Sequence, residues 1–321
     1  MHAMGSGDVH RFRTLTVLVT CLAAASPGCS GCLTRQEKES TPVAGEVADG
    51  GVAEFLARQA SLPPELQWNL LIGEADDANR YPSTVAVFAH APSEQPRYRG
   101  CSGVLLSPEL VLTAAHCLCR PHMDSGAGSG ENLRIDASAC ATTATVLTYT
   151  YEPLPGAQGM ESWSAEYEGA VQPHPGFALL MNAQGAVVAS HADLAVIRLD
   201  AHVQSNIPPV QLAAEEAHPG ELMTVVGYGY IEAIGGMDGK RRFSRERVKK
   251  FLDPGGERVE FGSPDLHAYK GDTGGPCLRE TEHGPELLGI SSRGLGKEPT
   301  FTSISPYRDW LNEQTRLRST P

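Results

Sequence analysis

The chain has 321 residues, 41% of them apolar, with 34 glycines and 23 prolines. This length suits one large all-β domain behind an N-terminal extension, because β-barrel domains commonly run to about 200–250 residues. The 26 Lys and Arg residues stand against 38 Asp and Glu residues, a net charge of −12. Since such a field repels polyanions, we expect no nucleic-acid partner.

Residues 1–25 predict an export signal. The run TLTVLVTCLAAA at 14–25 is apolar but too short to cross a bilayer as a helix, and it matches the apolar region of a signal peptide. Its small alanines offer a cleavage site. Cys29 and Cys32, each preceded by glycine, offer lipid attachment to a membrane as the alternative. We therefore expect a secreted, periplasmic or lipid-anchored protein.

Residues 26–70 predict a linker or pro-segment. They are rich in Glu, Ala, Gly, Pro and Ser and contain few bulky apolar residues. Such a composition cannot bury enough surface to offset the entropy lost on ordering. We expect the folded domain to span residues 71–317.

Residues 101–106 and 111–117 predict two short strands joined by a turn at Ser107 and Pro108. The second run, VLTAAHC, ends in His116 and Cys117. Five of the eight cysteines follow the N-terminal region, and an odd number in an exported protein indicates two disulfides and one further thiol.

A zinc site is the alternative use of these cysteines, because Cys and His both ligate zinc. It would draw on Cys101, His116, Cys117, Cys119 and Cys140. No Cys-x-x-Cys pair occurs among them, and His116 and Cys117 would point to opposite sides of a strand. Disulfides are therefore the favoured interpretation.

Asp193 stands directly ahead of a nearly continuous apolar strand in the run HADLAVIRL at 191–199. Burying a carboxylate costs several kcal/mol unless a partner compensates it, and a buried histidine is such a partner. An acid that caps a strand edge is the alternative. His174, in the segment HPGF, is expected to be a loop residue.

Residues 240–250, KRRFSRERVKK, contain seven basic residues. We interpret them as a solvated edge strand whose charges resist pairing with another chain. A binding site for a polyanion is the alternative interpretation.

Residues 306–317 predict a C-terminal helix with Ser305 as its cap and proline in its first turn. Trp310, Leu311 and Leu317 are expected to form its apolar face.

Residues 270–277, KGDTGGPC, place three glycines and a proline around one acid and one hydroxyl. Glycine adopts tight backbone conformations at little cost, so such a turn brings main-chain N–H groups close to a reacting centre. The stretch predicts a nucleophile loop that carries Thr273.

These motifs resemble those of the chymotrypsin- and trypsin-like serine proteases. GDTGGP is similar to the family's GDSGGP, with Thr273 in place of the serine; LTAAHC and HADLAVIRL resemble its histidine and aspartate blocks. The resemblance implies an all-β fold of two packed six-stranded antiparallel Greek-key barrels with a C-terminal helix. It further implies a monomer that acts on a peptide or protein substrate, with no metal and no cofactor.

The resemblance implies a triad of His116, Asp193 and Thr273. In this triad His116 takes the hydroxyl proton, Asp193 orients the imidazole, and Thr273 attacks the scissile carbonyl, while the N–H groups of Gly271 and Thr273 form the oxyanion hole. The added methyl group restricts the threonine rotamers and would lie near the histidine-block disulfide, so we expect weak hydrolysis. A pseudoprotease that binds peptides without cutting them is the alternative.

The resemblance also implies neighbouring roles. His267 would lie at the floor of the primary pocket, which argues against a preference for Arg or Lys, and Ser292 and Gly294 would bind the substrate backbone. Leu71 would begin the mature chain and pair with Asp272, although the residue before Leu71 is not basic.

Two disulfides follow from the same resemblance. The family pairs the cysteines that correspond to Cys101 and Cys117. This pairing leaves Cys119 and Cys140 for the second bridge.

Overall fold

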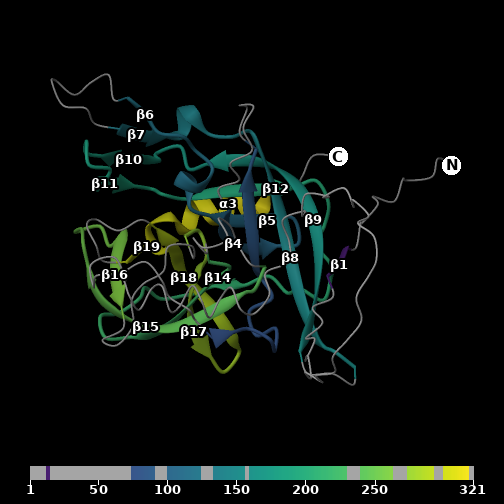
Figure 1. Ribbon diagram of the computed structural model, residues 1–321. Coiled ribbons are helices and arrows are strands. Elements are labelled where there is room, and N and C mark those ends of the chain that lie inside the picture. The colour runs from purple at the N-terminus through teal and green to yellow at the C-terminus, as the bar shows by residue number, and fades with distance from the viewer. Residues whose placement is uncertain are drawn as a thin grey trace, which may run out of the picture.

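The computed structural model describes residues 12–14, 74–90, 100–123, 133–155, 159–229, 239–262, 273–292 and 299–317. Its strands form two closed barrels and one smaller sheet (Figure 1). The predicted signal, linker and lipid-attachment cysteines, apart from the strand at 12–14, lie outside these ranges.

The first barrel closes through six antiparallel strands in the order β9-β12-β5-β4-β3-β8, with β8 returning to β9. A short strand, β1, pairs with residues 162–164 of β9, outside the part of β9 that pairs with β12. Most of β4 and all of β5 are buried, which explains the consecutive apolar residues VLL in β4 and LVL in β5. The strands are β1 (Phe12–Thr14), β3 (Thr84–Ala89), β4 (Gly100–Ser107), β5 (Leu110–Thr113), β8 (Thr143–Pro153), β9 (Met160–Pro173) and β12 (Ala195–Leu199).

The second barrel also closes through six antiparallel strands, in the order β18-β17-β14-β15-β16-β19, with β19 returning to β18. Two short strands extend it, because β13 runs parallel to β18 and β2 pairs with β15. The strands are β2 (Glu74–Ala75), β13 (Gln211–Leu212), β14 (Leu222–Gly227), β15 (Arg242–Phe251), β16 (Arg258–Gly262), β17 (Pro276–Thr281), β18 (Gly284–Ser292) and β19 (Thr300–Ser303). The two barrels confirm the predicted fold.

The prediction of an edge strand at 240–250 is wrong. Strand β15 is paired on one side with β14 and on the other with β16. Its side chains alternate, with Arg245, Arg247 and Lys249 exposed and Glu246 and Val248 buried. The charges therefore cover the outer face of an internal strand, where they do not interfere with pairing.

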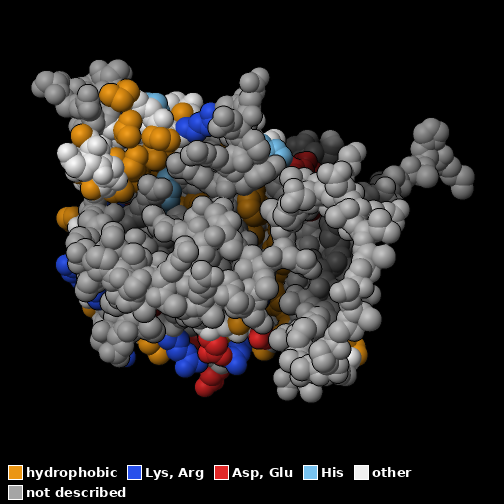
Figure 2. All heavy atoms as spheres, viewed as in Figure 1, with side chains coloured by type: hydrophobic (Ala, Val, Ile, Leu, Met, Phe, Trp, Pro, Cys, Tyr) orange, Lys and Arg blue, Asp and Glu red, His pale blue; other side chains and the backbone are white. Residues whose placement is uncertain are grey.

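A further sheet of four strands, in the order β11-β10-β7-β6, was not predicted. Two segments of the chain build it, one that follows His116 and one that precedes Asp193. Figure 2 shows apolar side chains gathered over these strands, and Met123 and Val188 are 60% and 49% exposed. The strands are β6 (His122–Met123), β7 (Leu133–Asp136), β10 (Ala178–Met181) and β11 (Val187–His191).

Three 3-10 turns and one α-helix complete the described elements: η1 (Ala115–Cys117), η2 (Ala137–Ala139), η3 (Ser305–Tyr307) and α3 (Arg308–Arg316). The strand predicted to run through Cys117 ends at Thr113, because His116 lies in η1. No helix among the described residues is long and apolar enough to cross a membrane.

The C-terminal helix differs in detail from its prediction. It begins at Arg308 with no side-chain cap, because Ser305 and the following proline form the separate turn η3. Leu311 is fully buried and Trp310 packs against the core, as expected. Leu317 is 47% exposed, since it follows the last helical residue in an extended conformation.

Candidate active site

His116 lies in η1, directly after β5. The disulfide between Cys101 and Cys117 ties this turn to β4. The His116 side chain is only 3% exposed. The turn therefore holds the imidazole inside the molecule, as the apolar sequence around it predicts.

Asp193 is the partner of this histidine. Nδ1 of His116 lies 2.6 Å from Oδ2 of Asp193, and the main-chain N–H of His116 donates to Oδ1 at 2.9 Å. The Asp193 side chain is completely buried. This contact confirms that a buried histidine compensates the buried carboxylate.

The electrostatics of the pair keep Asp193 ionised. Burial alone would raise the pKa of Asp193, but the charge of His116 and the hydrogen bonds from His116 and Ser292 together hold it below its usual value. When the imidazole gives up its second proton, the carboxylate at Oδ2 keeps the remaining proton on Nδ1. Nε2 is then left as the proton acceptor.

Ser292, at the end of β18, donates its hydroxyl to Oδ2 of Asp193 at 2.5 Å. The sequence suggested a substrate contact for this residue and gave no sign of the bond to Asp193. The two residues are 99 positions apart and lie in different barrels. Ser292 thus brings the second barrel into contact with the His116–Asp193 pair.

The predicted nucleophile loop is described from Thr273 onward and bridges the two barrels. The N–H of Ser102, in β4, donates to the Thr273 carbonyl at 2.9 Å. On the other side, Gly274 N–H donates to the Ser291 carbonyl at 2.8 Å, and Ser291 N–H donates to the Gly275 carbonyl at 2.9 Å. Main-chain hydrogen bonds thus fix Thr273 between β4 and β18.

Gly274 is required in this loop. Its φ is +86°, in the region that favours glycine, and a Cβ atom would lie 2.2 Å from the Ser102 carbonyl oxygen and 2.3 Å from Oγ1 of Thr113. Sγ of Cys117 lies 3.9 Å from the Thr273 carbonyl oxygen. The loop is therefore packed against both β4 and the disulfide beside His116, as expected.

Several predicted site residues lie outside the described part of the chain. They are the oxyanion-hole residue Gly271, the pair Leu71 and Asp272, and the pocket residues His267 and Gly294. His174 is described, and it lies in the loop between β9 and β10 as predicted.

The cysteines form the two expected disulfides, Cys101–Cys117 and Cys119–Cys140. Their four sulfurs are therefore not available as zinc ligands. In the described ranges no group of three or more His, Cys, Asp or Glu side chains is arranged to hold a metal ion.

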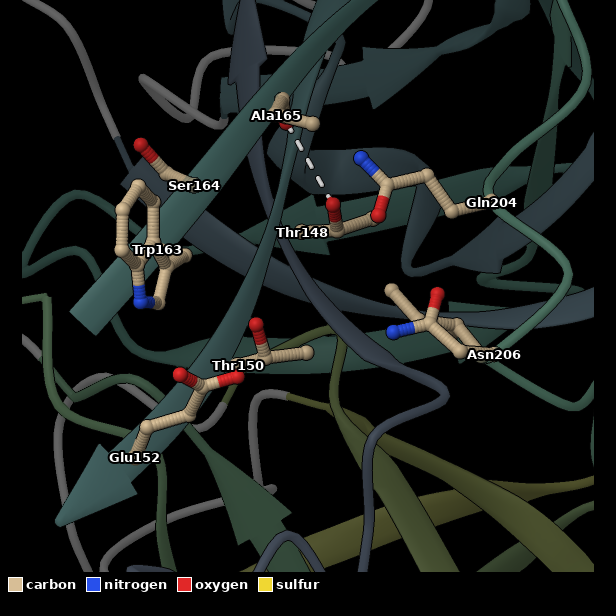
Figure 3. Close-up of a pocket in the computed structure, with 9 residues that line it drawn as sticks. Thr148, Thr150, Glu152, Trp163, Ser164, Ala165, Gln204 and Asn206 are labelled. Atoms are coloured by element: carbon tan, nitrogen blue, oxygen red, sulfur yellow. Dashed lines mark hydrogen bonds between the residues drawn. The ribbon is translucent and has the colours of Figure 1, made fainter. Parts of the chain in front are cut away.

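A hollow of about 300 Å³ lies away from this site, between β8, β9 and the segment at 204–207 (Figure 3). Its lining is mostly polar and includes Thr150, Glu152 and Asn206. Neither His116 nor Asp193 lines it, so it is distinct from the His116–Asp193 site.

The family model that describes trypsin matches residues 72–311. The chain belongs to the trypsin family. Human chymotrypsin-like elastase family member 1 is 24% identical over 263 residues, which cover 78% of this chain and 93% of the elastase. Human cathepsin G is 28% identical over 247 residues, which cover 71% of this chain and 80% of the cathepsin.

Other relatives of this trypsin-family chain are longer. CLIP domain-containing serine protease B10 of Anopheles gambiae is 28% identical over 234 residues, 67% of this chain but only 61% of that protein. The solved structure of mouse neuropsin, described as a serine protease, aligns with a TM-score of 0.51 at 20% identity. It covers 77% of this chain and all of neuropsin, which supports the fold.

Proposed function

We propose that this trypsin-family chain is an exported endopeptidase that hydrolyses peptide bonds with Thr273 as its nucleophile. The observation that carries the proposal is the buried contact of 2.6 Å between His116 Nδ1 and Asp193 Oδ2. A hydroxyl needs a base and a third group that orients the base, and this pair supplies an oriented base.

The reaction uses Nε2 of His116 as the base. Nε2 takes the proton of the Thr273 hydroxyl while Oγ1 attacks the carbonyl carbon of the scissile bond, and Asp193 stabilises the imidazolium that forms. The N–H groups of Gly271 and Thr273 hold the oxyanion. His116 then protonates the departing amine, which leaves an ester on Thr273. Water, activated by the same histidine, hydrolyses this ester.

The threonine makes this reaction slow. Its methyl group shares Cβ with the reacting hydroxyl, so only some rotamers direct Oγ1 towards His116. A displacement of about 1 Å costs on the order of a hundredfold in rate. The main-chain hydrogen bonds of Thr273 and Gly274 oppose a shift of the loop that would accommodate the methyl group.

A second candidate function is a peptide-binding pseudoprotease, and the methyl group of Thr273 is the observation that favours it. The cleft of such a protein would bind an extended peptide without cutting it. Both functions fit an exported protein, because disulfides persist in oxidising compartments.

Peptide cleavage tests the proposal. The exported chain would be purified as wild type, Thr273→Ser, Thr273→Ala and His116→Ala, and each would be incubated with a diverse peptide library read by mass spectrometry. We expect slow cleavage by wild type, faster cleavage by Thr273→Ser, and none by the other two. Absence of cleavage by both wild type and Thr273→Ser, together with retained peptides, would favour the pseudoprotease.

A further inference from the structure

The backbone next to Asp193 has an uncommon conformation. Ala192 has φ +47°, a region that costs a residue with a Cβ atom about 1–2 kcal/mol, and it is fully buried. The N–H of Leu194 donates to the Ala192 carbonyl at 2.7 Å. Asp193 therefore lies at the centre of a tight turn, and the conformation of Ala192 decides where its carboxylate points.

Two side chains from the C-terminal half of the chain hold this conformation. The N–H of Ala192 donates to Oε1 of Glu257 and to Oη of Tyr307, the latter at 3.1 Å. Oε2 of Glu257 accepts from Nδ1 of His191 at 2.7 Å. Both oxygens of one carboxylate thus bind consecutive residues of the turn.

Glu257 is itself firmly placed. Its N–H donates to Oδ1 of Asp253 at 2.9 Å, and its carbonyl accepts from the N–H of Ser303, in β19, at 2.7 Å. The side chain is only 14% exposed. Glu257 directly precedes β16, so the second barrel holds a turn of the first barrel.

Tyr307 completes the arrangement. Burial and the neighbouring Glu257 raise the pKa of its hydroxyl, so the hydroxyl stays protonated. Its ring packs edge-on against His174 at 5.0 Å, and the N–H of His174 donates to the Leu194 carbonyl at 2.8 Å. The turn is therefore fixed on both sides of Asp193.

We propose that Glu257 is a positioning residue: its carboxylate holds Ala192 in the left-handed conformation and thereby aims the Asp193 carboxylate at His116. Without this acceptor, Ala192 keeps only the longer bond to Tyr307, and the turn relaxes towards an ordinary φ. The catalytic consequence rests on the proposed function, but the geometric consequence does not.

Proton NMR tests the geometry without turnover. We expect the proton between His116 Nδ1 and Asp193 to be strongly deshielded because their contact is short, and ¹⁵N-histidine labelling would identify it. We expect Glu257→Ala to shift this resonance or lose it through exchange with water, while Glu257→Gln, which keeps an acceptor oxygen, retains it. Glu260→Ala is the matched control, because Glu260 is similarly buried in β16 and pairs instead with Lys250 at 3.3 Å.

A folded Glu257→Ala protein with an unchanged resonance would overturn the proposal. If Glu257→Ala does not fold, Glu257→Asp replaces it: this variant keeps the charge but is one methylene too short to reach Ala192, and it must shift or lose the resonance as well. An unchanged resonance in folded Glu257→Asp would overturn the proposal as well.

Kinetics in a Thr273→Ser background supply the second readout. We expect Glu257→Ala to lower kcat about tenfold or more with little change in KM, since Glu257 acts on the orientation of Asp193 and not on substrate binding. An unchanged kcat would contradict the positioning role. If no variant cleaves peptides, the proposed function fails, and the NMR result still decides the role of Glu257.

Discussion

Asp76 and Arg241 form an ion pair in which both side chains are completely buried, with 2.7 Å between Oδ2 and Nε. Asp76 also accepts from the N–H groups of Arg80 and Tyr81, at 2.7 and 3.0 Å. The guanidinium donates to the Tyr149 carbonyl at 3.0 Å. The pair therefore joins the segment around Asp76 to both barrels. Hydrogen bonds satisfy its buried polar atoms.

Breaking this ion pair should be costly. Arg241→Met leaves the Asp76 carboxylate buried without its cation, and we expect the free energy of unfolding to fall by about 3–5 kcal/mol. Urea denaturation measures the change. Lys250→Met is the control: Lys250 is 63% exposed in its pair with Glu260, and its loss should cost at most about 1 kcal/mol. Equal losses in the two variants would contradict the role of the buried pair.

The close approach of Gly274 to β4 predicts a large loss of stability when a Cβ atom is added at this position. Gly274→Ala combines a positive φ with a contact of 2.2 Å to the Ser102 carbonyl, and we expect a loss of about 3 kcal/mol or more. Gly185→Ala is the control, because Gly185 has φ +77° with no atom within 4 Å of an added Cβ. It should lose only about 1–2 kcal/mol. Urea curves that give the same loss for both variants would show that the contact does not matter.

Burial of Glu246 should make the folded protein less stable at high pH than at low pH. Its carboxylate oxygens are buried, and within the described ranges no hydrogen bond of good geometry reaches them; Ser244 lies near enough to interact only weakly. Burial raises the pKa of Glu246 to about 7 from an ordinary value of 4.5, and Ser244 and Lys249 offset part of that rise. As the pH rises, Glu246 ionises in the unfolded chain before it ionises in the folded chain. The contribution of Glu246 to the free energy of unfolding therefore falls as the pH rises from 4.5 to about 7.

Glu246→Gln removes this effect. We expect it to match wild type at pH 4 and to exceed it at pH 8 by up to about 3 kcal/mol, which is the pKa difference converted to free energy. Urea titrations at both pH values measure the difference. A stability difference that is the same at pH 4 and pH 8 would contradict the burial of an ionisable Glu246.

The sequence predicted the parts of the fold and site that have local signals. His116 and Asp193 each lie beside a distinctive apolar run, and the three glycines of the predicted nucleophile loop lie within five residues. The sequence gives no local signal for the sheet of β6, β7, β10 and β11, because its strands are short and come from two separate segments of the chain. Glu257 escaped prediction for the same reason: it contacts Ala192 across 65 positions, and no local pattern marks such a contact.

The edge-strand error has a different cause. The total charge of the basic run suggests an edge strand, whereas β15 places alternate side chains on opposite faces. Arg245 and Arg247 are exposed, while Glu246 between them is buried. Alternation within the run, and not its net charge, was the informative signal.

The most direct test of the central claim is to find the residue that an active-site phosphonate modifies. A fluorophosphonate reacts with a hydroxyl that a neighbouring base activates. Peptide mapping by mass spectrometry after labelling should locate the adduct on Thr273 in the wild-type chain. The adduct should form faster on residue 273 of Thr273→Ser, and His116→Ala should carry none. An unlabelled residue 273 in both wild type and Thr273→Ser, or labelling that survives His116→Ala, would contradict a nucleophile activated by the His116–Asp193 pair.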